Sequence, residues 1–262
     1  MIRARRRGVS VLRGAEFLLA LAIVVALWHG ASLFVGKATL LPAPSVVARA
    51  WLELAGDSLP SDTLASLVHL AAGYSLGAST GLAIAIVCAR FPAVETMLDP
   101  LIELFRPIGA IAWIPLAILM FGIGTGVPIF LIFYAATFPV LINTLAGVKQ
   151  VDQRLIEAAR MLGASPRMVV THVVFPATLP LVLAGARLSL GVAWASMVAA
   201  ELTGSDEGLG WRIFWYQEFF AMDKVMAVIL TIGVLGYALD SGLRWLQRSV
   251  TRWSPDGEAT GA

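Results

Sequence analysis

Residues 155–176, LIEAARMLGASPRMVVTHVVFP, form a polar segment between two long apolar stretches. Glu157 and Arg160 stand three residues apart, a spacing that lets them pair on one exposed face of a helix. Gly163 can then take the left-handed conformation that closes a helix at its C-terminus. The first half of the segment is therefore predicted to be a short helix that ends at Gly163.

The second half of the segment starts a new helix at once. Ser165 is of the type that caps a helix N-terminus, and Pro166 suits the first helical position. Phe175-Pro176 is expected to end this second helix, because the residue before a proline is pushed out of the α region. The whole segment is therefore predicted to be two short helices joined at an elbow.

The composition indicates that this elbow belongs to an integral membrane protein. Hydrophobic residues make up 58% of the chain and charged residues only 14%, against roughly half and a quarter in soluble domains. A helix of about 20 mainly apolar residues spans a bilayer, and several stretches meet or approach that length. They are Phe17–Val35, Leu64–Ala89, Ile108–Gly122, Val127–Ala146, Thr178–Ala200 and Val225–Trp245.

The third of these stretches, Ile108–Gly122, is short and contains Pro115. A membrane helix tolerates a proline where its neighbours satisfy the freed carbonyl, so this stretch is still predicted to be a span. The expected fold class is all-α, a polytopic membrane protein with about six transmembrane helices.

The Lys and Arg residues indicate which connections face the cytoplasm, because positive residues are retained there. The N-terminal tail and the alternate connecting segments hold most of them, and the remaining connections hold only Lys37, Arg49, Arg212 and Lys224. Both termini and the elbow are therefore predicted to be cytoplasmic, in a multi-pass protein of the cell inner (plasma) membrane. The basic tail acts either as a topology signal or as a contact for anionic lipid.

Several chemistries are excluded by what the sequence lacks. The single Cys88 allows no internal disulfide and no thiolate metal site, and His29, His69 and His172 show no ligand spacing, so no metal site is expected and each histidine is interpreted as structural. No GxxxxGK[ST] phosphate loop occurs, and no nucleophile and base stand at a readable spacing. The net charge of +2, without a basic stripe, argues against nucleic-acid binding. The chain is predicted not to be an enzyme and to hold no cofactor.

Part of the elbow resembles the EAA signature of the permease subunits of ABC importers. The matching residues are Glu157, Ala158, Ala159, Gly163, Val173, Phe175 and Pro176. Valine stands at 173 where isoleucine is usual, and phenylalanine at 175 where leucine is usual. Residues 98–124, 138–148 and 185–202 also resemble the nitrate, sulfonate, taurine and bicarbonate branch of these permeases.

The resemblance implies a type I importer permease, in which two permease copies form the pathway across the lipid bilayer. A homodimer is expected, together with two cytoplasmic ABC ATPase subunits, which bind the ATP, and an extracytoplasmic substrate-binding protein. The elbow would be the coupling helix that docks on an ATPase, with small alanines that allow close approach and apolar knobs that fill a groove. The coupling residues would be Glu157, Ala158, Ala159, Arg160, Met161, Leu162 and Gly163.

On this interpretation the chain has three regions. Residues 1–16 are the cytoplasmic basic tail, residues 17–250 are the transmembrane permease domain, and residues 251–262 are the cytoplasmic C-terminal tail. The coupling segment occupies residues 150–176 of the permease domain.

Polar and aromatic residues inside the spans are candidates for the substrate pathway or gate, since such groups normally face a bundle interior or a cavity. The guanidinium of Arg187 can receive a planar anion as a bidentate partner, or it pairs with a helix terminus or another subunit. Tyr74 and Trp113 either line a vestibule or pack in the core, and Glu201 accepts hydrogen bonds at a gate or from the binding protein. The full set is Tyr74, Trp113, Asn143, Arg187, Ser189, Trp194, Ser196 and Glu201.

Two other functions stay open from the sequence. An ion-coupled secondary carrier would be expected to have carboxylates near mid-membrane or paired broken helices, and the expected spans have no acidic residue at their centres. A permease for a non-anionic small solute is the second. The branch resembled makes a small anion the expected cargo, such as a sulfonate, taurine, nitrate or a related organic acid.

Overall fold

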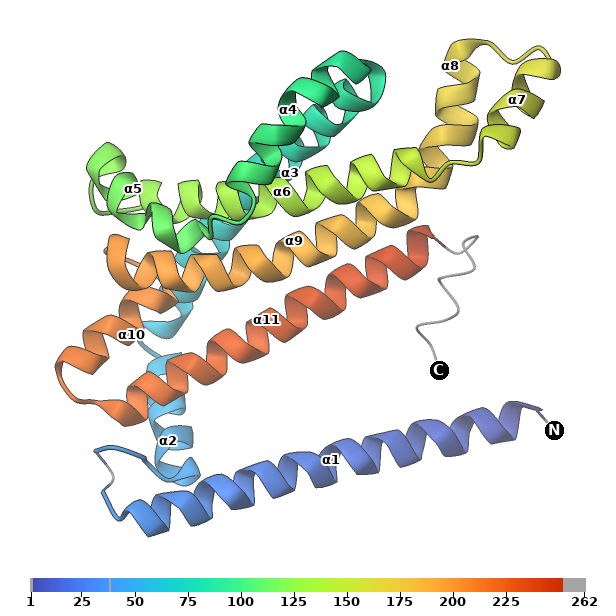
Figure 1. Ribbon diagram of the computed structural model, residues 1–262. Coiled ribbons are helices and arrows are strands. Elements are labelled where there is room, and N and C mark those ends of the chain that lie inside the picture. The colour runs from blue at the N-terminus through green and yellow to red at the C-terminus, as the bar shows by residue number, and fades with distance from the viewer. Residues whose placement is uncertain (1, 38, 252–262) are drawn as a thin grey trace. The chain divides into compact units, whose positions relative to one another are not determined.

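The structure of this protein is a computed structural model that describes residues 2–37 and 39–251 (Figure 1). All regular structure within these residues is helical, as the composition predicted. Residues 252–262, most of the expected C-terminal tail, lie outside the described residues, and so do the side chains of residues 1–15, 17 and 18. The elements are α1 (Ile2–Val35), α2 (Pro44–Ala55), α3 (Leu59–Arg90), α4 (Pro92–Phe105), the 3-10 helix η1 (Ala110–Trp113), α5 (Ile114–Phe121), α6 (Gly126–Lys149), α7 (Gln153–Met161), α8 (Pro166–Val169), the π-helix η2 (Val170–Val174), α9 (Phe175–Gly204), α10 (Leu209–Glu218) and α11 (Met222–Val250).

The helices fall into two compact units. The first unit comprises Met1–Pro60 and Ile213–Thr231, and the second comprises Ser61–Arg212 and Ile232–Ala262. Within the first unit, α2 buries Val47, Ala50 and Leu54, which lie on one face of the helix. All the geometry that concerns function below lies in the second unit.

In the described part of the chain, four helices are long and apolar enough to cross a membrane: α3, α6, the continuous helix Pro166–Gly204 and α11. The pair formed by Pro92–Phe105 and Ala110–Phe121 would be a further span if counted as one, although it bends by 84°. In α1, the apolar part Leu19–Val35 coincides with most of the first expected stretch.

The third expected span is built differently from the prediction. Its break does not fall at Pro115, which lies in the first turn of α5, where a helix needs no proline N–H. The chain instead turns between α4 and η1, where Pro107 and Gly109 interrupt the helix. An amphipathic helix, α4, precedes the break and is fastened at its start by an ion pair between Glu95 and Lys149.

The core of the second unit forms where α3 and α9 pack against α6. Gly77 of α3 lies so close to α6 that a Cβ atom on it would stand 2.5 Å from the carbonyl oxygen of Phe133 and 2.8 Å from the Cβ of Ala136. Gly73 and Gly81, four residues to either side, are equally crowded by α6. Small residues at this spacing let two membrane helices approach closely. The buried side chains of Ile132 and Met197 complete this core.

The elbow keeps the predicted break but not the predicted end. Gly163 has φ of +82°, and the side chain of Ser165 accepts a hydrogen bond from the backbone N–H of Met168 at 3.3 Å. Phe175-Pro176 does not end a helix, however, and the helix runs without interruption from Pro166 to Gly204. The π-turn η2 stands directly before this proline. A proline ring crowds the carbonyl of the preceding turn, and the wider π-turn gives that ring room.

One further detail of the elbow differs from the sequence prediction. Among the described residues, no ion pair forms between Glu157 and Arg160, because both side chains extend into solvent, where such a pair gains little. The N-cap of α7 is Asp152, whose carboxylate accepts a hydrogen bond from the N–H of Arg154 at 2.9 Å.

Candidate functional site

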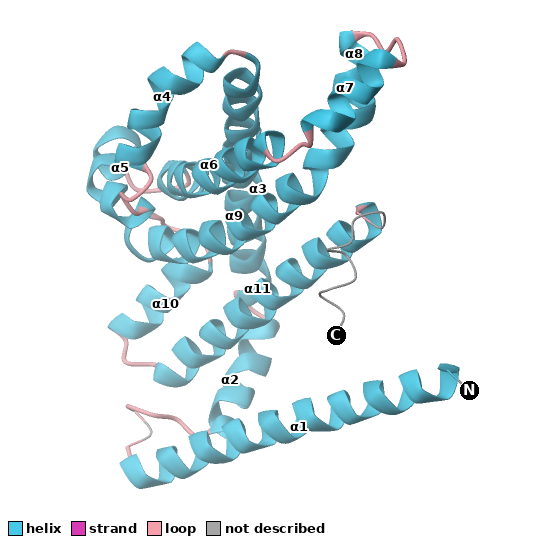
Figure 2. Cartoon of the chain, turned by 45° about the vertical axis from the view of Figure 1, so that its right-hand side comes forward, coloured by secondary structure: helices cyan, strands magenta, loops and turns pink. Residues whose placement is uncertain are grey.

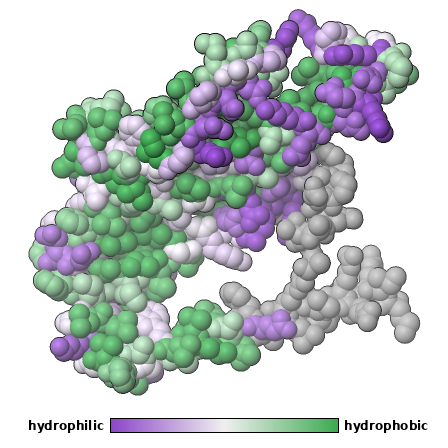
Figure 3. All heavy atoms as spheres, viewed as in Figure 1, coloured by the Kyte–Doolittle hydropathy of each residue, from purple (hydrophilic) through white to green (hydrophobic). Residues whose placement is uncertain are grey.

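The elbow lies at one end of the long helix Pro166–Gly204, and its tip is exposed. Figures 1 and 2 both show α7 and α8 projecting beyond the adjoining end of α9. Met161 is 83% exposed and Leu162 is 89% exposed, although both are large apolar side chains. In Figure 3, hydrophilic residues gather around this elbow. Two adjacent, nearly fully exposed apolar side chains within a polar surface are typical of a protein contact site.

The other coupling residues surround this tip. Glu157, Ala158 and Arg160 are exposed and Ala159 is half-buried. A Cβ atom on Gly163 would meet nothing within 4 Å. Glycine is therefore required here because its φ is positive, and not because another part of the chain approaches closely. The seven predicted coupling residues are consecutive and occupy the last part of α7 and the turn that follows it.

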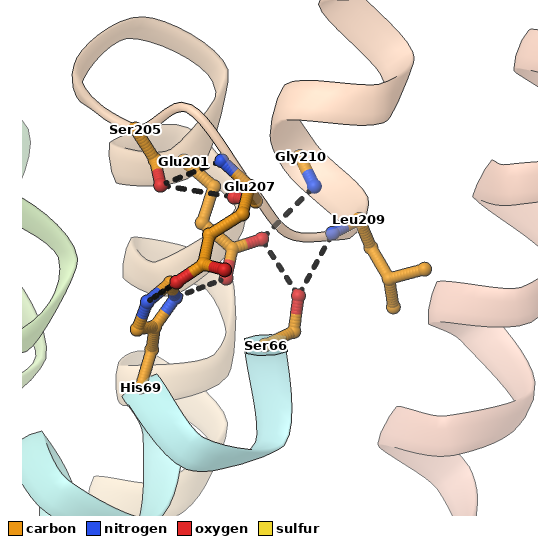
Figure 4. A network of polar contacts seen from close by, with 7 residues as sticks. All are labelled: Ser66, His69, Glu201, Ser205, Glu207, Leu209 and Gly210. Atoms are coloured by element: carbon orange, nitrogen blue, oxygen red, sulfur yellow. Dashed lines mark hydrogen bonds and ion pairs between the residues drawn. The ribbon is translucent and has the colours of Figure 1, made fainter. Parts of the chain in front are cut away.

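The opposite end of α9 carries a buried polar network centred on Glu201 (Figure 4). The carboxylate of Glu201 is fully buried and accepts hydrogen bonds through both oxygens. Oε2 accepts from the hydroxyl of Ser66 at 2.8 Å and from the backbone N–H of Gly210 at 2.9 Å. Oε1 lies 2.9 Å from Nδ1 of His69, and because a carboxylate accepts, the ring N–H donates. Donors from α3 and from the start of α10 thus converge on one side chain of α9.

A second layer of contacts holds the loop between α9 and α10. The hydroxyl of Ser66 accepts the N–H of Leu209 at 2.8 Å while it donates to Glu201. The hydroxyl of Ser205 donates to the carbonyl of Glu207 at 2.9 Å. The Glu207 carboxylate then reaches toward His69, with Oε1 3.5 Å from Nε2.

Two glycines make this arrangement possible. Gly208 has φ of +100°, and a Cβ atom on it would stand 2.6 Å from the Glu201 carboxyl carbon. A Cβ atom on Gly210 would stand 2.5 Å from the carbonyl oxygen of Val198. The loop can therefore fold over the buried carboxylate only because both positions lack a side chain.

Two clusters of charged side chains also join helices of the second unit. Arg212 forms a two-pronged ion pair with Asp62, at 2.5 and 3.1 Å, beside the Glu201 network. Farther along α9, Arg187 forms a similar pair with Asp240 of α11, at 2.7 and 3.3 Å, and Arg244 contacts the same carboxylate at 2.5 Å. Two guanidinium groups thus share one carboxylate.

The cluster of Arg187, Asp240 and Arg244 borders an open groove of about 570 Å³ between α9 and α11. Apolar side chains make up most of the rest of its lining, among them Leu188 and Val192. Of the eight residues predicted for the pathway or gate, Arg187 is the one that lines this groove.

The remaining predicted pathway residues lie in contacts between or within helices. The Tyr74 hydroxyl donates to the carbonyl of Ala186 at 2.8 Å, and the buried Ser189 hydroxyl donates to the carbonyl of Ala136 at 2.9 Å. Asn143 donates to the carbonyl of Pro139 at 2.8 Å and packs against Gly185. Trp194 packs against Gly236, and Ser196 is buried. Trp113 contacts the rings of Phe105 and Tyr134. In this structure these side chains act as helix contacts, as the core alternative for Tyr74 and Trp113 allowed.

The sequence indicates Glu201 as a candidate site residue but does not indicate the residues of α3 that lie around it. His69 is expected from the sequence to be structural, and Ser66 and Asp62 are not among the expected site residues, yet His69 and Ser66 bond to Glu201 and Asp62 pairs with Arg212. These three residues stand at positions i, i+4 and i+7 of one helix, so they share a face. A polar stripe of this kind in an apolar helix is the signal that would have indicated a polar network.

Comparison with known proteins gives a consistent result. Residues 81–252 match the family described as "binding-protein-dependent transport system inner membrane component". The chain is 38% identical over 240 residues to the taurine transport system permease protein of Escherichia coli (strain K12), which covers 89% of this chain and 87% of that protein. It is 38% identical over 193 residues to the bicarbonate transport system permease protein of Synechococcus elongatus, which covers 72% of this chain and 69% of that protein. In fold, it resembles a chain of the inward-facing MetNI methionine ABC transporter with a TM-score of 0.64, 21% identity and coverage of 74% and 96%.

Proposed function

This chain belongs to the family of inner membrane components of binding-protein-dependent transport systems, and we propose that two copies of it form the translocation pathway of an ATP-driven importer for a small anion. It is an ABC importer permease, related to transport permeases and not to enzymes. ATP binding and hydrolysis belong to two separate ATPase subunits. An extracytoplasmic binding protein delivers the substrate, and both termini of the chain are cytoplasmic.

The observation that carries this proposal is the exposed apolar tip of the elbow. Met161 and Leu162 have no neighbours that bury them within the described chain, and exposed apolar side chains gain free energy when a partner covers them. A groove on the ATPase is the proposed cover. Because the elbow joins a helix that is continuous from Pro166 to Gly204, a displacement of its tip moves the whole of α9.

Alternating access follows from this connection. The ATPase shifts the permease between its two states only if it binds them with different affinity. The elbow remains docked throughout the cycle, and the movement passes along α9 to the helices that it contacts. α3, α6 and α11 are all joined to α9 by the contacts described above.

Two observations support a small anion as the substrate. The relatives are permeases for taurine, a sulfonate, and for bicarbonate. In addition, Arg187 and Arg244 place two positive charges against the single carboxylate of Asp240 beside the groove. A guanidinium is suited to the planar oxygen pairs of sulfonates and carboxylates. The proposed substrates are therefore sulfonates, taurine, nitrate and related organic acids.

The coupling role is tested by replacing Gly163 with isoleucine. A β-branched residue is strained at positive φ by about 1–3 kcal/mol, so the tip of the elbow will change shape while the rest of the chain stays intact. We expect Gly163→Ile to lower uptake in proteoliposomes that contain permease, ATPase and binding protein, while ATP hydrolysis continues. Gly233→Ala, at a helical position where a Cβ atom meets nothing within 4 Å, is the control. Normal uptake by Gly163→Ile would refute the proposed role of the elbow.

A further inference from the structure

One contact in the Glu201 network is incomplete. His69 is 1% exposed, and its Nδ1 is bonded to Glu201. Within the described residues, its Nε2 has no hydrogen-bond partner, and Glu207 Oε1 lies 3.5 Å from it. A carboxylate only accepts, so Glu207 can complete this contact when the ring carries a proton on Nε2 as well as on Nδ1. In that imidazolium form a small approach of Glu207 gives the buried N–H its missing hydrogen bond.

The Glu207 side chain, unlike the buried ring of His69, is accessible to solvent. It is 49% exposed, although the His69 atom that it faces is buried. Water therefore competes with His69 for the carboxylate, and an ion pair of this kind contributes little net stability. The contact between Glu207 and His69 is therefore weaker than the hydrogen bonds that Glu201 accepts, which measure 2.8 to 2.9 Å.

We propose that Glu207 is a latch on the extracytoplasmic side of the permease: in the resting chain it closes on the imidazolium form of His69, which donates from both ring nitrogens, and it is released when a Lys or Arg side chain of the substrate-binding protein takes its carboxylate. This inference rests on the proposed function, because it needs a binding protein as the partner. The partner's chemistry follows from the charge and exposure of Glu207. Glu207 is a positioning residue, which acts on the helices through His69.

The latch is connected to the elbow by a single helix. Glu201 stands in the last turn of α9, and the same helix begins beside the elbow at Pro166. When Glu207 holds His69, the α9–α10 loop is fastened to α3, and the outer ends of α3 and α9 stay together. When a partner removes Glu207, that restraint weakens. Since coupling between two sites is reciprocal, the binding protein would then influence the elbow, and the docked ATPase would influence affinity for the binding protein.

The test compares Glu207→Gln with Asp206→Asn. Both variants remove one negative charge from the same exposed loop, but only the first alters the group facing His69. Each is assembled with its ATPase subunits, and ATP hydrolysis is measured without and with a saturating concentration of the cognate binding protein. We expect Glu207→Gln to raise hydrolysis without the binding protein by about two- to five-fold and to lower the stimulation ratio correspondingly. Asp206→Asn should change at most the concentration of binding protein needed for half-stimulation.

A spectroscopic measurement on the permease alone tests the contact directly. The chain contains three histidines, so ¹⁵N-histidine spectra are simple, and a His69→Gln variant assigns the signals of His69. We expect Glu207→Gln to shift the Nε2 signal and Asp206→Asn to leave it in place. An unchanged Nε2 signal in Glu207→Gln would show that the carboxylate does not act on this ring and would overturn the latch.

These measurements separate failure of the latch from failure of the proposed function. If the wild-type chain assembles with no ATPase, the proposed function fails and the latch fails with it, whatever the spectra show. If the wild type is stimulated by the binding protein and Glu207→Gln behaves like Asp206→Asn in both rate and ratio, only the latch is wrong.

Discussion

At the end of α9 opposite the elbow, a few side chains connect helices that are far apart in the sequence. Glu201 sits in an apolar helix, and it is tolerated there because three donors reach its two oxygens. The donors come from α3 and α10, far apart in sequence. One carboxylate therefore determines how three helices meet.

Replacing Glu201 with glutamine tests this account at the level of one residue. The carboxamide keeps the size but turns one oxygen into an NH₂ group, which must face a donor. We expect a loss of about 1–3 kcal/mol in the free energy of unfolding, which corresponds to a drop of several degrees in the thermal midpoint of the detergent-solubilised chain. Gly233→Ala serves as the control, and an unaltered midpoint for Glu201→Gln would contradict the three-donor description.

At the scale of helices, close packing of α3 on α6 holds the core of the second unit together. Gly73, Gly77 and Gly81 let the two backbones approach, and the apolar side chains of α6 and α9 fill the remaining space. The helix Pro166–Gly204 depends on a local change of helix type. Pro176 would be expected to break this helix, but the π-turn before Pro176 keeps the elbow attached to a continuous helix.

Gly77→Ala tests the packing between helices. The added methyl group would stand 2.5 Å from the carbonyl oxygen of Phe133, and backbone atoms cannot rotate away, so α3 and α6 must separate. Overpacking of this kind costs about 1–3 kcal/mol. The thermal midpoint should fall, whereas Gly233→Ala should keep it or raise it through better helix propensity. Equal midpoints for the two variants would mean that α3 and α6 do not approach as described.

For the whole molecule, the proposed function requires that the two ends of α9 face opposite sides of the membrane. The elbow must meet an ATPase in the cytoplasm, and the α9–α10 loop must meet a binding protein outside. The helix Pro166–Gly204 has 39 residues, or about 58 Å at 1.5 Å per residue, which is long enough to cross the bilayer and extend beyond it.

Labelling of single cysteines tests this orientation. In a Cys88→Ser background, an Arg167→Cys variant should react with a membrane-impermeant maleimide only in inside-out vesicles. Asp206→Cys should react only in intact cells. Serine replaces the buried Cys88 with a side chain of similar size that does not react with the maleimide. Labelling of both positions from the same side would refute the proposed topology.

The sequence by itself determined the membrane class, the approximate spans and the position of the elbow. These depend on local properties: apolar length and the turn chemistry of Gly163, Ser165 and Pro166. It also singled out Glu201 as a polar group in an apolar helix. Local rules failed at Pro176, because a π-turn can relieve a clash that an α-turn cannot.

Only the tertiary structure decided what the polar residues of the spans contact. Asp240 lies 53 positions from Arg187 in the chain, and Ser66 lies 135 positions from Glu201. Periodicity places each residue on a helix face, but it does not say which faces meet. That depends on how closely helices approach, and therefore on glycines such as Gly77, Gly208 and Gly210, whose missing side chains matter only once the helices are packed.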